Sequence, residues 1–572
     1  MYCRVLACDF DGTGAYDGHL APEVATALGR ARARGVSTLL VTGRVLEDLQ
    51  LAEVDLASFD AVVAENGAVV WLSHAKRTIL LGTPPPEQFL GELRARGIPL
   101  HTGGVVIGTS DRHGAEMLEL IHHFGIDSQL VFNRAAMMLL PSGVNKAIGT
   151  ERALEELGRS ARNLIAFGDA ENDHPLFAIA EIGVAARGSV PSIATIADEQ
   201  LSQPGALGVA QYVERLDEAG WIAPTPARHH IVLGRAPDGV EAALPGSGVN
   251  VMITGDPREG KSWLAGLAVE RLLDHGYRVC VIDPEGDHVA LGYRPQVLVF
   301  GHELPLPAPG VVARVMCDHS LSVVLDLSTL RQEQKLAYGD AALSALETSR
   351  AVTGIPHWTV IDEAHYFFHE PAPCLDHFEG RTGSYVFATY RPSLISDRVY
   401  ATVAAHLITR TVVEEERYFI TGLLQERGPR DLAVAEALGA IEKPGAGLLL
   451  ELPSGPRWQP FTPDQRVSPH VHHARKYADI RLPDSQEFLF RQTGGARVLA
   501  HNVTEFCAAI RTVPLGSLCH HLRAGDFSRW ASEVLGDAEL ASGLRKLELT
   551  ALTGPPARRE EIIRHVTDRY TV

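Results

Sequence analysis

Paired cysteine motifs, long apolar runs and an excess of positive charge are all missing from this 572-residue sequence. Its seven cysteines are scattered and never take the C-x-x-C spacing, which argues against a zinc module and suits a reducing compartment. No apolar run reaches the ~18 residues that would cross a bilayer, and the first residues lack a signal-peptide pattern. We therefore expect a cytoplasmic globular protein with no membrane partner.

Acidic residues outnumber basic ones, with 70 Asp and Glu against 52 Lys and Arg and a formal net charge of −18. A surface with this balance repels polyanions, so non-specific binding to nucleic acid is not the default expectation. If the protein formed a ring, basic loops could line its pore, and the net charge would not reveal them. Nucleic acid therefore stays open as a partner.

The first ~210 residues alternate strand-like and helix-like patterns, which is typical of a parallel α/β domain. A strand is expected at 5–8, a helix at 22–34 that starts with Pro22, and a second strand at 38–41. Alternate side chains of a strand share a face, so Asp9 and Asp11 are expected to converge where the first strand ends. Two carboxylates this close need a cation between them or a shared proton, and Mg²⁺ is the natural cation because it prefers oxygen ligands.

Further groups along this segment suit phosphoryl transfer. Thr42, which ends the next strand, offers a hydroxyl and a backbone N–H to a phosphoryl oxygen. Lys146 can neutralise negative charge that develops at phosphorus. Asp169 and Asp173 follow another apolar strand and supply more carboxylates for the metal. Asp-Gly after a strand is, by itself, more often only a turn, but four motifs in this order argue against coincidence.

This ordered set, together with Glu65-Asn66-Gly67 and the Gly-Val-Asn-Lys run that ends at Lys146, resembles the haloacid dehalogenase superfamily of phosphatases over residues 1–212. The spacing is most similar to the Cof-type branch of that superfamily. The resemblance implies a Rossmann-like core with a small α+β cap, within about 45–140, that closes over the cleft and carries substrate choice.

The resemblance also assigns roles to the matching residues. Asp9 would be the nucleophile that forms an aspartyl-phosphate, and Asp11 would protonate the leaving group and then activate water. Thr42 and Lys146 would hold the phosphoryl group. The implied Mg²⁺ ligands are Asp9, Asp11, Asp169 and Asp173.

A second phosphate-binding pattern lies near the middle of the chain. An apolar strand at 249–253 is followed by Gly255-Asp256-Pro257-Arg258-Glu259-Gly260-Lys261-Ser262 and then by a helix. Strand, glycine loop and helix in this order are typical of a P-loop. The loop from Gly255 to Gly260 would cradle the phosphates of ATP, Lys261 would reach the β and γ phosphates, and Ser262 would bind Mg²⁺.

A later apolar strand ends in Asp362 and Glu363, the expected partners of such a loop. Asp362 would support Mg²⁺ and Glu363 would polarise the attacking water. With the runs 281–287 and 387–392, the pattern resembles the HerA and FtsK branch of RecA-like ATPases over about 228–456. The resemblance implies a hexameric homo-oligomer in which an arginine completes a neighbour's site. Arg410 is a candidate, and a surface salt bridge is an equal alternative.

Two departures from that family's pattern bear on activity. Arg258 and Glu259 stand where small residues are common, and they would be strained if the backbone there needed a positive φ. Tyr390 replaces a glutamine that usually senses the γ-phosphate. Nucleotide binding is therefore a firmer expectation than fast hydrolysis. No DNA-binding barrel precedes the loop, which weighs against a translocase.

Linkers are expected at 213–227, which is rich in proline, and at 457–478. They would separate the two α/β domains from a small, mainly helical domain at 479–572 with an interaction or regulatory role. This tail resembles a bacterial domain of unknown function that accompanies other enzymes. Its adjacent His520 and His521 are explained more simply by packing than by metal binding.

The leading interpretation is a bifunctional Mg²⁺-dependent hydrolase, in which a phosphomonoesterase for a phosphorylated small molecule is joined to a module that binds and hydrolyses ATP. Two alternatives stay open. One is a hexameric DNA-processing motor with an end-trimming phosphatase, which would show steep salt-dependent binding to nucleic acid. The other is a nucleotide-sensing scaffold with weak catalysis. The variants Asp9→Asn and Lys261→Ala separate these readings.

Overall fold

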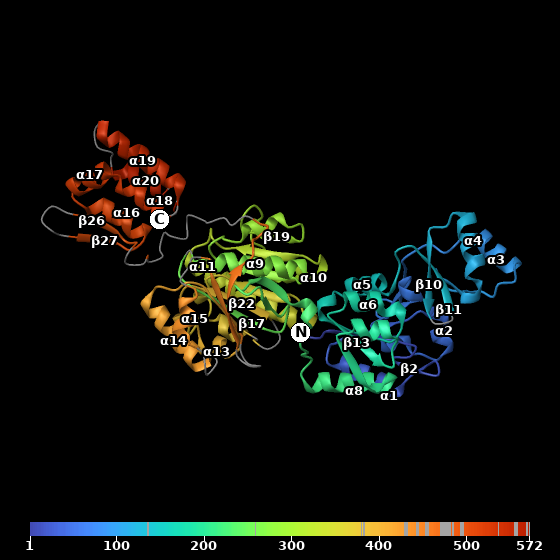
Figure 1. The fold of residues 1–572 in the computed structure, drawn as a ribbon. Helices are drawn as coiled ribbons and strands as arrows, with labels where there is room; N and C mark the ends of the chain where they lie inside the picture. The colour runs from blue at the N-terminus through green and yellow to red at the C-terminus, as the bar shows by residue number, and fades with distance from the viewer. Residues whose placement is uncertain are drawn as a thin grey trace.

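The computed structural model describes residues 1–570, with gaps at 134–135, 258, 379, 381–383, 428–432, 442–444, 452–456, 469–481, 483–485, 492–496, 536, 554–558 and 568–569. Three parts follow one another along the chain, and the N-terminus lies where the first part meets the second (Figure 1). Within the described ranges, no helix has both the length and the apolar character of a membrane span.

The first part is built on an eight-stranded sheet in the order β14-β13-β12-β1-β4-β5-β6-β7. Strands β14 to β5 in this order are parallel, and β6 and β7 are antiparallel. Their bounds are β1 (Val5–Asp9), β4 (Ser37–Val41), β5 (Ala61–Ala64), β6 (Val69–Leu72), β7 (Arg77–Leu80), β12 (Leu164–Gly168), β13 (Ile182–Arg187) and β14 (Glu199–Pro204). A short hairpin, β2 (Ala15–Tyr16) and β3 (His19–Leu20), follows β1.

Helices cover both faces of this sheet because its strands are apolar on both sides. Leu6 and Cys8 of β1 pack in the same cluster as α1 (Pro22–Ala33), α2 (Leu46–Leu51) and α8 (Gly205–Glu218). Val5 and Ala7 pack on the other face with α5 (Lys146–Glu156), α6 (His174–Ile179) and α7 (Pro191–Ile196). The expected strand, helix and strand therefore form where the sequence pattern predicted, and this part has the Rossmann-like α/β core.

A cap with its own small core is inserted between β7 and α5. Its four-stranded antiparallel sheet has the order β10-β11-β9-β8, and its two helices share the apolar cluster of that sheet. Its elements are α3 (Glu87–Ala95), β8 (His101–Thr102), β9 (Ile107–Ser110), α4 (Gly114–Phe124), β10 (Ser128–Asn133) and β11 (Ala136–Pro141). The cap is shorter than the expected interval, because residues 61–80 extend the core sheet as β5 to β7.

The second part contains an eleven-stranded sheet in the order β16-β15-β25-β24-β23-β17-β22-β21-β18-β20-β19. The seven strands from β23 to β19 are parallel, and the remaining four pair antiparallel. Its strands are β15 (Ile231–Arg235), β16 (Glu241–Leu244), β17 (Asn250–Thr254), β18 (Val279–Asp283), β19 (Val297–Phe300), β20 (Ser322–Asp326), β21 (Trp358–Ile361), β22 (Ser384–Thr389), β23 (Val403–Ile408), β24 (Gly447–Glu451) and β25 (Arg457–Pro463).

Helix α9 (Lys261–Asp274) packs on one face of this sheet, and α10 (Pro309–Asp318) and α11 (Gln332–Thr353) pack on the other. The shorter helices α12 (Cys374–His377) and α13 (Asp397–Tyr400) join the second face, and α14 (Glu414–Arg427) and α15 (Val434–Gly439) pack near β23 and β24. The third part combines the hairpin β26 (Phe488–Arg491) and β27 (Arg497–Ala500) with α16 (Val503–Thr512), α17 (Leu515–Ala524), α18 (Asp526–Glu533), α19 (Ala538–Thr553) and α20 (Arg559–Thr567).

Two expected linkers begin inside regular elements. The first was expected from residue 213, but α8 continues to Glu218, because Val213 and Leu216 are buried in the first core. The second was expected from residue 457, but Arg457–Pro463 forms β25, which pairs with β24 and β15. Both boundaries are corrected, because the end of α8 packs on the first core and β25 lies inside the second sheet between β15 and β24.

The first and second parts meet through the amino ends of their parallel strands. On the first part, Arg4 and Asn163 directly precede β1 and β12, and on the second part, His357 directly precedes β21. His357 Nε2 lies 3.1 Å from Asn163 Oδ1, and the Arg4 guanidinium donates to the carbonyl of Ala351 at the end of α11. Parallel sheets bind ligands at their carboxyl ends. The two candidate sites therefore face away from the shared boundary.

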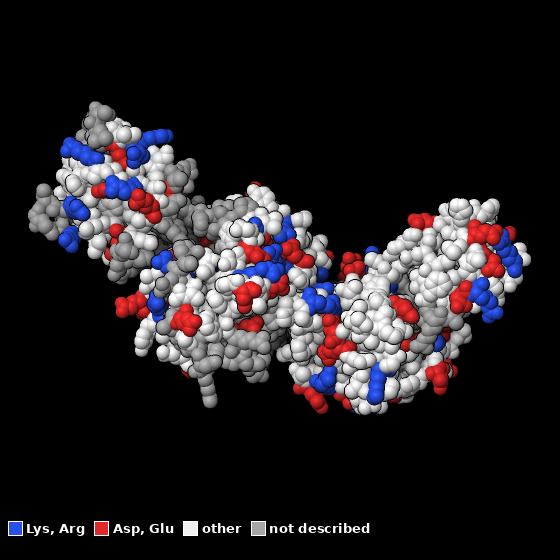
Figure 2. Space-filling view, in the orientation of Figure 1, with Lys and Arg blue, Asp and Glu red and all other residues white. Residues whose placement is uncertain are grey.

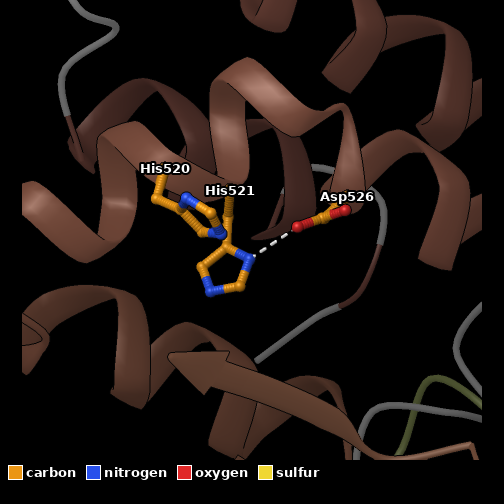
Figure 3. Close-up of side chains that lie close together, drawn as sticks. All are labelled: His520, His521 and Asp526. Atoms are coloured by element: carbon orange, nitrogen blue, oxygen red, sulfur yellow. Dashed lines mark hydrogen bonds and ion pairs between the residues drawn. The ribbon is translucent and has the colours of Figure 1, made fainter. Parts of the chain in front are cut away.

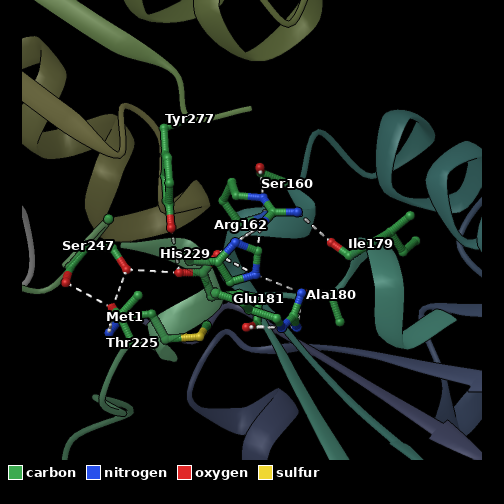
Figure 4. Close-up of polar contacts among 12 residues, drawn as sticks. Met1, Ser160, Arg162, Ile179, Ala180, Glu181, Thr225, His229, Ser247 and Tyr277 are labelled. Carbon is green, nitrogen blue, oxygen red and sulfur yellow. Dashed lines mark hydrogen bonds and ion pairs between the residues drawn. The ribbon is translucent and has the colours of Figure 1, made fainter. Parts of the chain in front are cut away.

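Glu181 is the buried centre of this boundary (Figure 4). Its carboxylate accepts hydrogen bonds from Tyr277 (2.7 Å) and Ser247 (3.0 Å) of the second part, and it pairs with Arg162 of the first part at 3.1 Å. A buried carboxylate needs such partners to offset its desolvation. These contacts order the two parts relative to each other.

Candidate functional site

Three buried carboxylates and one lysine meet at the carboxyl end of the first sheet. Asp9 continues the alternation of Val5 and Ala7, so it faces α5 and α6. Lys146, the first residue of α5, is directed there by Asn145, whose side chain caps the helix. Lys146 Nζ lies 2.6 Å from Asp9 Oδ1 and 2.6 Å from Asp173 Oδ1. Oxygen atoms of Asp9, Asp169 and Asp173 lie within 4.8 Å of one another.

Burial and charge act in opposite directions on these groups. Burial raises the pKa of Asp9 well above its ordinary value, and the neighbouring Asp173 and Asp169 add to this while Lys146 opposes it. For Lys146, burial would lower the pKa, but the charges of Asp173 and Asp9 outweigh it and raise the pKa. The lysine is thus held as a cation, and ionised Asp9 depends on positive charge beside it.

The carboxylate cluster fits a divalent cation. Lys146 contributes one positive charge, which is less than the negative charge of Asp9, Asp169 and Asp173 together. Asp173 is fixed by its Oδ2, which accepts the backbone N–H groups of Asp169 (2.9 Å) and Ala170 (3.1 Å). Carboxylate oxygens are the ligands that Mg²⁺ prefers. These residues could therefore hold Mg²⁺, as predicted for Asp9, Asp169 and Asp173.

Thr42 lies beside this cluster, at the end of the neighbouring strand. It follows Val41, which is the register partner of Asp9. The Thr42 side chain is buried, and its hydroxyl accepts the backbone N–H of Arg44 at 3.1 Å. The structure therefore places Thr42 at the same sheet edge as Asp9, where the sequence pattern expected it.

Asp11 does not join the carboxylate cluster, so its predicted convergence with Asp9 is wrong in this conformation. β1 ends at Asp9, and Gly12 takes a φ of +83°, so the strand alternation does not extend to Asp11. Asp11 instead forms two hydrogen bonds with Arg44, Nε to Oδ2 at 2.8 Å and Nη2 to Oδ1 at 2.6 Å. The Arg44 guanidinium also lies over the Phe10 ring, 4.8 Å from its centre.

A cavity of about 400 Å³ lies between the cap and the core, next to Arg44. Arg44 and Asp48 line it from the core, and Leu100, His101 and Met138 line it from the cap. His101 is paired with Asp48 at 2.7 Å, whereas Arg44 is paired with Asp11. The cavity therefore combines an apolar wall with a guanidinium, which suits a small organic anion. The sequence pattern gave Arg44 no role, because its contact with Asp11 joins residues that are distant in sequence.

The second candidate site is the loop between β17 and α9. The positive φ angles that the structure describes in this loop fall on Gly255 (+152°) and Gly260 (+94°), so Glu259 does not carry the strain that its size suggested. Lys261 Nζ donates to the carbonyl of Asp256 at 2.8 Å and lies 5.8 Å from the centre of the Tyr390 ring. The loop thus precedes the N-terminus of α9 with the predicted glycines and lysine in order.

Asp362 reaches this loop from the end of β21. Ser262 Oγ donates to Asp362 Oδ2 at 3.2 Å, and His288 Nε2 lies 3.2 Å from the same oxygen. Glu363 follows with a φ of +46° and is buried, with its Oε2 3.6 Å from His365 Nδ1. The structure therefore brings Lys261, Ser262, Asp362 and Glu363 to one end of the second sheet.

Arg410 lies against its own chain. Arg410 Nη1 pairs with Glu259 at 3.1 Å, and the carbonyl of Arg410 accepts the backbone N–H of Asp256 at 2.9 Å. Of the two readings left open for Arg410, the arrangement corresponds to the salt bridge.

A further group of metal-type ligands, His520, His521 and Asp526, lies in the third part (Figure 3). His521 uses both ring nitrogens: Nδ1 lies 2.7 Å from Asp526 Oδ2, and Nε2 accepts the backbone N–H of Arg491 at 3.0 Å. A metal would have to replace these contacts, so they support a packing role for His521. On the face shown in Figure 2, basic and acidic residues of the described chain are interspersed and form no continuous basic band.

Comparisons with known proteins concern the first part of the chain. Residues 6–91 and 116–213 match the family model described as haloacid dehalogenase-like hydrolase. A phosphoglycolate phosphatase of Methanothermobacter thermautotrophicus is 29% identical over 232 residues, which cover 38% of this chain and 100% of that protein. Phosphoglycolate phosphatase 2 of Saccharolobus solfataricus is 29% identical over 193 residues, which cover 31% of this chain and 76% of that protein.

A solved structure of a haloacid dehalogenase-like hydrolase from Bacteroides thetaiotaomicron aligns with 37% of this chain and 99% of its own, at 19% identity and a TM-score of 0.34. The family match and the relatives confirm that the first part is a haloacid dehalogenase-like hydrolase domain.

Proposed function

We propose that the protein is a Mg²⁺-dependent phosphomonoesterase whose active site lies at the carboxyl end of β1, and that its second part binds ATP. The observation that carries the phosphatase proposal is the buried lysine between two carboxylates, Lys146 with Asp9 and Asp173, beside Asp169. This arrangement supplies a nucleophile, a cation for the phosphoryl group and ligands for a metal.

In the proposed reaction, an Asp9 carboxylate oxygen attacks phosphorus and the bond from phosphorus to the ester oxygen breaks. Asp11 gives its proton to the departing oxygen, and the aspartyl-phosphate is then hydrolysed by a water whose proton Asp11 takes back. Lys146 and Thr42 hold phosphoryl oxygens, and bound Mg²⁺, held by Asp9, Asp169 and Asp173, would neutralise further charge. Asp11 must leave Arg44 before it can act.

The cavity and the relatives together suggest the substrate class. Both relatives described above are named phosphoglycolate phosphatases, and the Arg44 guanidinium lines a cavity of about 400 Å³ beside apolar cap residues. A substrate carboxylate could replace Asp11 as the partner of Arg44 and so release the general acid. Phosphoglycolate and similar small phosphorylated acids are therefore the first substrates to try.

The test is a series of phosphate monoesters with leaving groups of increasing pKa. Wild type should hydrolyse all of them with Mg²⁺ and none with excess EDTA. In Asp11→Asn, we expect kcat to fall by about 10²-fold or more for alkyl phosphates and by less for nitrophenyl phosphate, because a good leaving group needs no proton. Equal losses across the series would contradict the role of Asp11, and no activity in wild type would contradict the proposal itself.

The arrangement at the second site supports nucleotide binding. The proposal rests on the meeting of Lys261, Ser262 and Asp362 at one end of the second sheet, with Gly255 and Gly260 in the loop and the N-terminus of α9 behind it. Glu363 is the residue that we propose for polarising water. We propose ATP as the ligand, and hydrolysis and a hexameric assembly as properties to be measured with it.

Replacement of Lys261 by alanine is expected to weaken ATP binding by roughly 10²-fold, because the charge-assisted contacts to the β and γ phosphates are lost. Titration with a fluorescent ATP analogue measures this directly. Lys546→Met, on the exposed face of α19, is the control and should bind as wild type does. Equal affinity of Lys261→Ala and wild type would refute this site.

A DNA-processing motor finds less support. The net charge is −18 and the basic residues on the face in Figure 2 are dispersed among acidic ones. The sites also lie at opposite ends of the joined sheets, which suits two separate ligands. A scaffold without turnover is the outcome if ATP binds while both hydrolytic activities are absent.

A further inference from the structure

The tripeptide Glu65-Asn66-Gly67 has an unusual backbone and lies at the centre of the first part. Glu65, Asn66 and Gly67 all have positive φ angles, of 54°, 52° and 100°. Two successive non-glycine residues in this region are costly and are found where the surroundings impose them, often near functional sites. All three residues are buried, between the end of β5 and the start of β6.

The backbone of this tripeptide holds the loop that carries Thr42. The N–H of Asn66 donates to the carbonyl of Thr42 at 3.0 Å, and the N–H of Glu65 donates to the carbonyl of Arg44 at 2.9 Å. These two hydrogen bonds fix both ends of the segment from Thr42 to Arg44. The residue proposed to hold the phosphoryl group and the guanidinium of the cavity are therefore positioned together.

The Glu65 side chain reaches in the opposite direction, into the cap. Its Oε1 accepts the N–H of Gly104 at 2.7 Å, and its Oε2 accepts the N–H groups of Val105 and Val106, each at 2.9 Å. The residue is 1% exposed, so these are charge-assisted hydrogen bonds away from water. Val106 lines the cavity beside Arg44. One carboxylate thus ties a wall of the cavity to the core.

The neighbouring residues connect to the remaining catalytic segments. The Asn66 side chain accepts a hydrogen bond from Asn172 at 2.8 Å, one residue before Asp173. A Cβ on Gly67 would lie 1.9 Å from the carbonyl oxygen of Asn145, which directly precedes Lys146. Only glycine permits this approach together with the positive φ. The tripeptide therefore contacts the segments of Thr42, Lys146 and Asp173 as well as the cap.

We propose that Glu65 is a positioning residue that sets the cap wall of the substrate cavity relative to the Thr42–Arg44 loop, and so determines which leaving groups the site accepts. The inference rests on the proposed phosphatase function. Glu65 touches neither phosphorus nor metal in this scheme. It acts through Val106 on the leaving-group side and through Arg44 on the core side.

The test compares a large and a small phosphate donor in Glu65→Gln, where an amide NH₂ would face one of the cap N–H donors. For nitrophenyl phosphate, whose leaving group extends toward the cavity, we expect KM to rise about tenfold. For acetyl phosphate, whose leaving group is small, kcat and KM should stay within about twofold. Glu87→Gln, at an exposed position in the same cap, is the control for both substrates.

A second readout does not depend on turnover. Hydrogen exchange of the backbone amides of Gly104, Val105 and Val106 should quicken at least tenfold in Glu65→Gln and stay unchanged in Glu87→Gln. Gly103→Ala is an independent variant, since its Cβ would lie 2.4 Å from Glu65 Oε1 and displace the carboxylate while keeping its charge. It should reproduce both effects.

Equal losses on both substrates, or unchanged exchange of the three amides, would overturn the positioning role. An inactive wild type would instead refute the phosphatase proposal, and the exchange experiment would then still decide whether Glu65 fastens the cap.

Discussion

Asp9→Asn is expected to abolish phosphatase turnover, with kcat reduced on the order of 10⁴-fold or more, the scale on which removal of a covalent nucleophile acts. The amide cannot form the acyl phosphate, and neither Lys146 nor the metal ligands can replace it. The measurement is Mg²⁺-dependent hydrolysis of nitrophenyl phosphate, together with a search for phosphate covalently bound to the protein after rapid quenching. Retained turnover in Asp9→Asn would remove Asp9 from the mechanism.

The same variant should not lose stability. Burial and the neighbouring carboxylates raise the pKa of Asp9, so the ionised form is costly to the fold at neutral pH. Asparagine removes that cost while Lys146 keeps its contact with Asp173. In EDTA, we expect the first part of Asp9→Asn to unfold at or above the temperature at which the first part of wild type unfolds. Lost turnover with retained stability would show that asparagine removes the nucleophile and leaves the fold intact.

Asp17→Asn is the matched control for this experiment. Asp17 is exposed, lies in the turn between β2 and β3 close in sequence to Asp9, and has a φ of 46°, which asparagine tolerates. Its turnover and stability should equal those of wild type. Loss of activity in Asp17→Asn would show that neutralising any nearby carboxylate impairs the enzyme.

The fold of the first part could be predicted from the sequence because short local patterns mark its strands and helices. The continuous apolar run at residues 5–8 places Asp9 at the end of β1, and the helix start at Lys146 directs its side chain toward the same edge of the sheet. Asp11 could not be placed this way. Its position depends on where the strand stops and on Arg44, which is 33 residues away in sequence.

The contacts between the first two parts could not be predicted from local sequence patterns either. Glu181 and His357 gave no motif, and their partners Tyr277 and Asn163 are distant in sequence. The predicted linker boundaries were wrong for a related reason. Residues 213–218 and 457–463 look like connecting segments, but the first end a helix that packs on the first core and the second form a strand between β15 and β24.

Lys146→Met is expected to convert the first domain into one whose stability depends on Mg²⁺. Removing one partner of a buried ion pair leaves the others uncompensated, at a cost of about 3–5 kcal/mol. Here Asp9 and Asp173 both lose a 2.6 Å contact, and Asp169 lies beside them. In EDTA, the temperature at which the first domain unfolds should fall by several degrees or more. The phosphatase activity should be lost.

Added Mg²⁺ should restore much of that stability, because a divalent cation supplies the charge that the lysine no longer provides. It should not restore turnover, since Lys146 is the proposed cation for the transferring phosphoryl group. Lys146→Arg keeps the charge and should be less sensitive to EDTA than Lys146→Met. If Mg²⁺ stabilises neither Lys146→Met nor wild type against thermal unfolding, then Asp9, Asp169 and Asp173 do not form a cation site. The carboxylate cluster would then require another explanation for its burial.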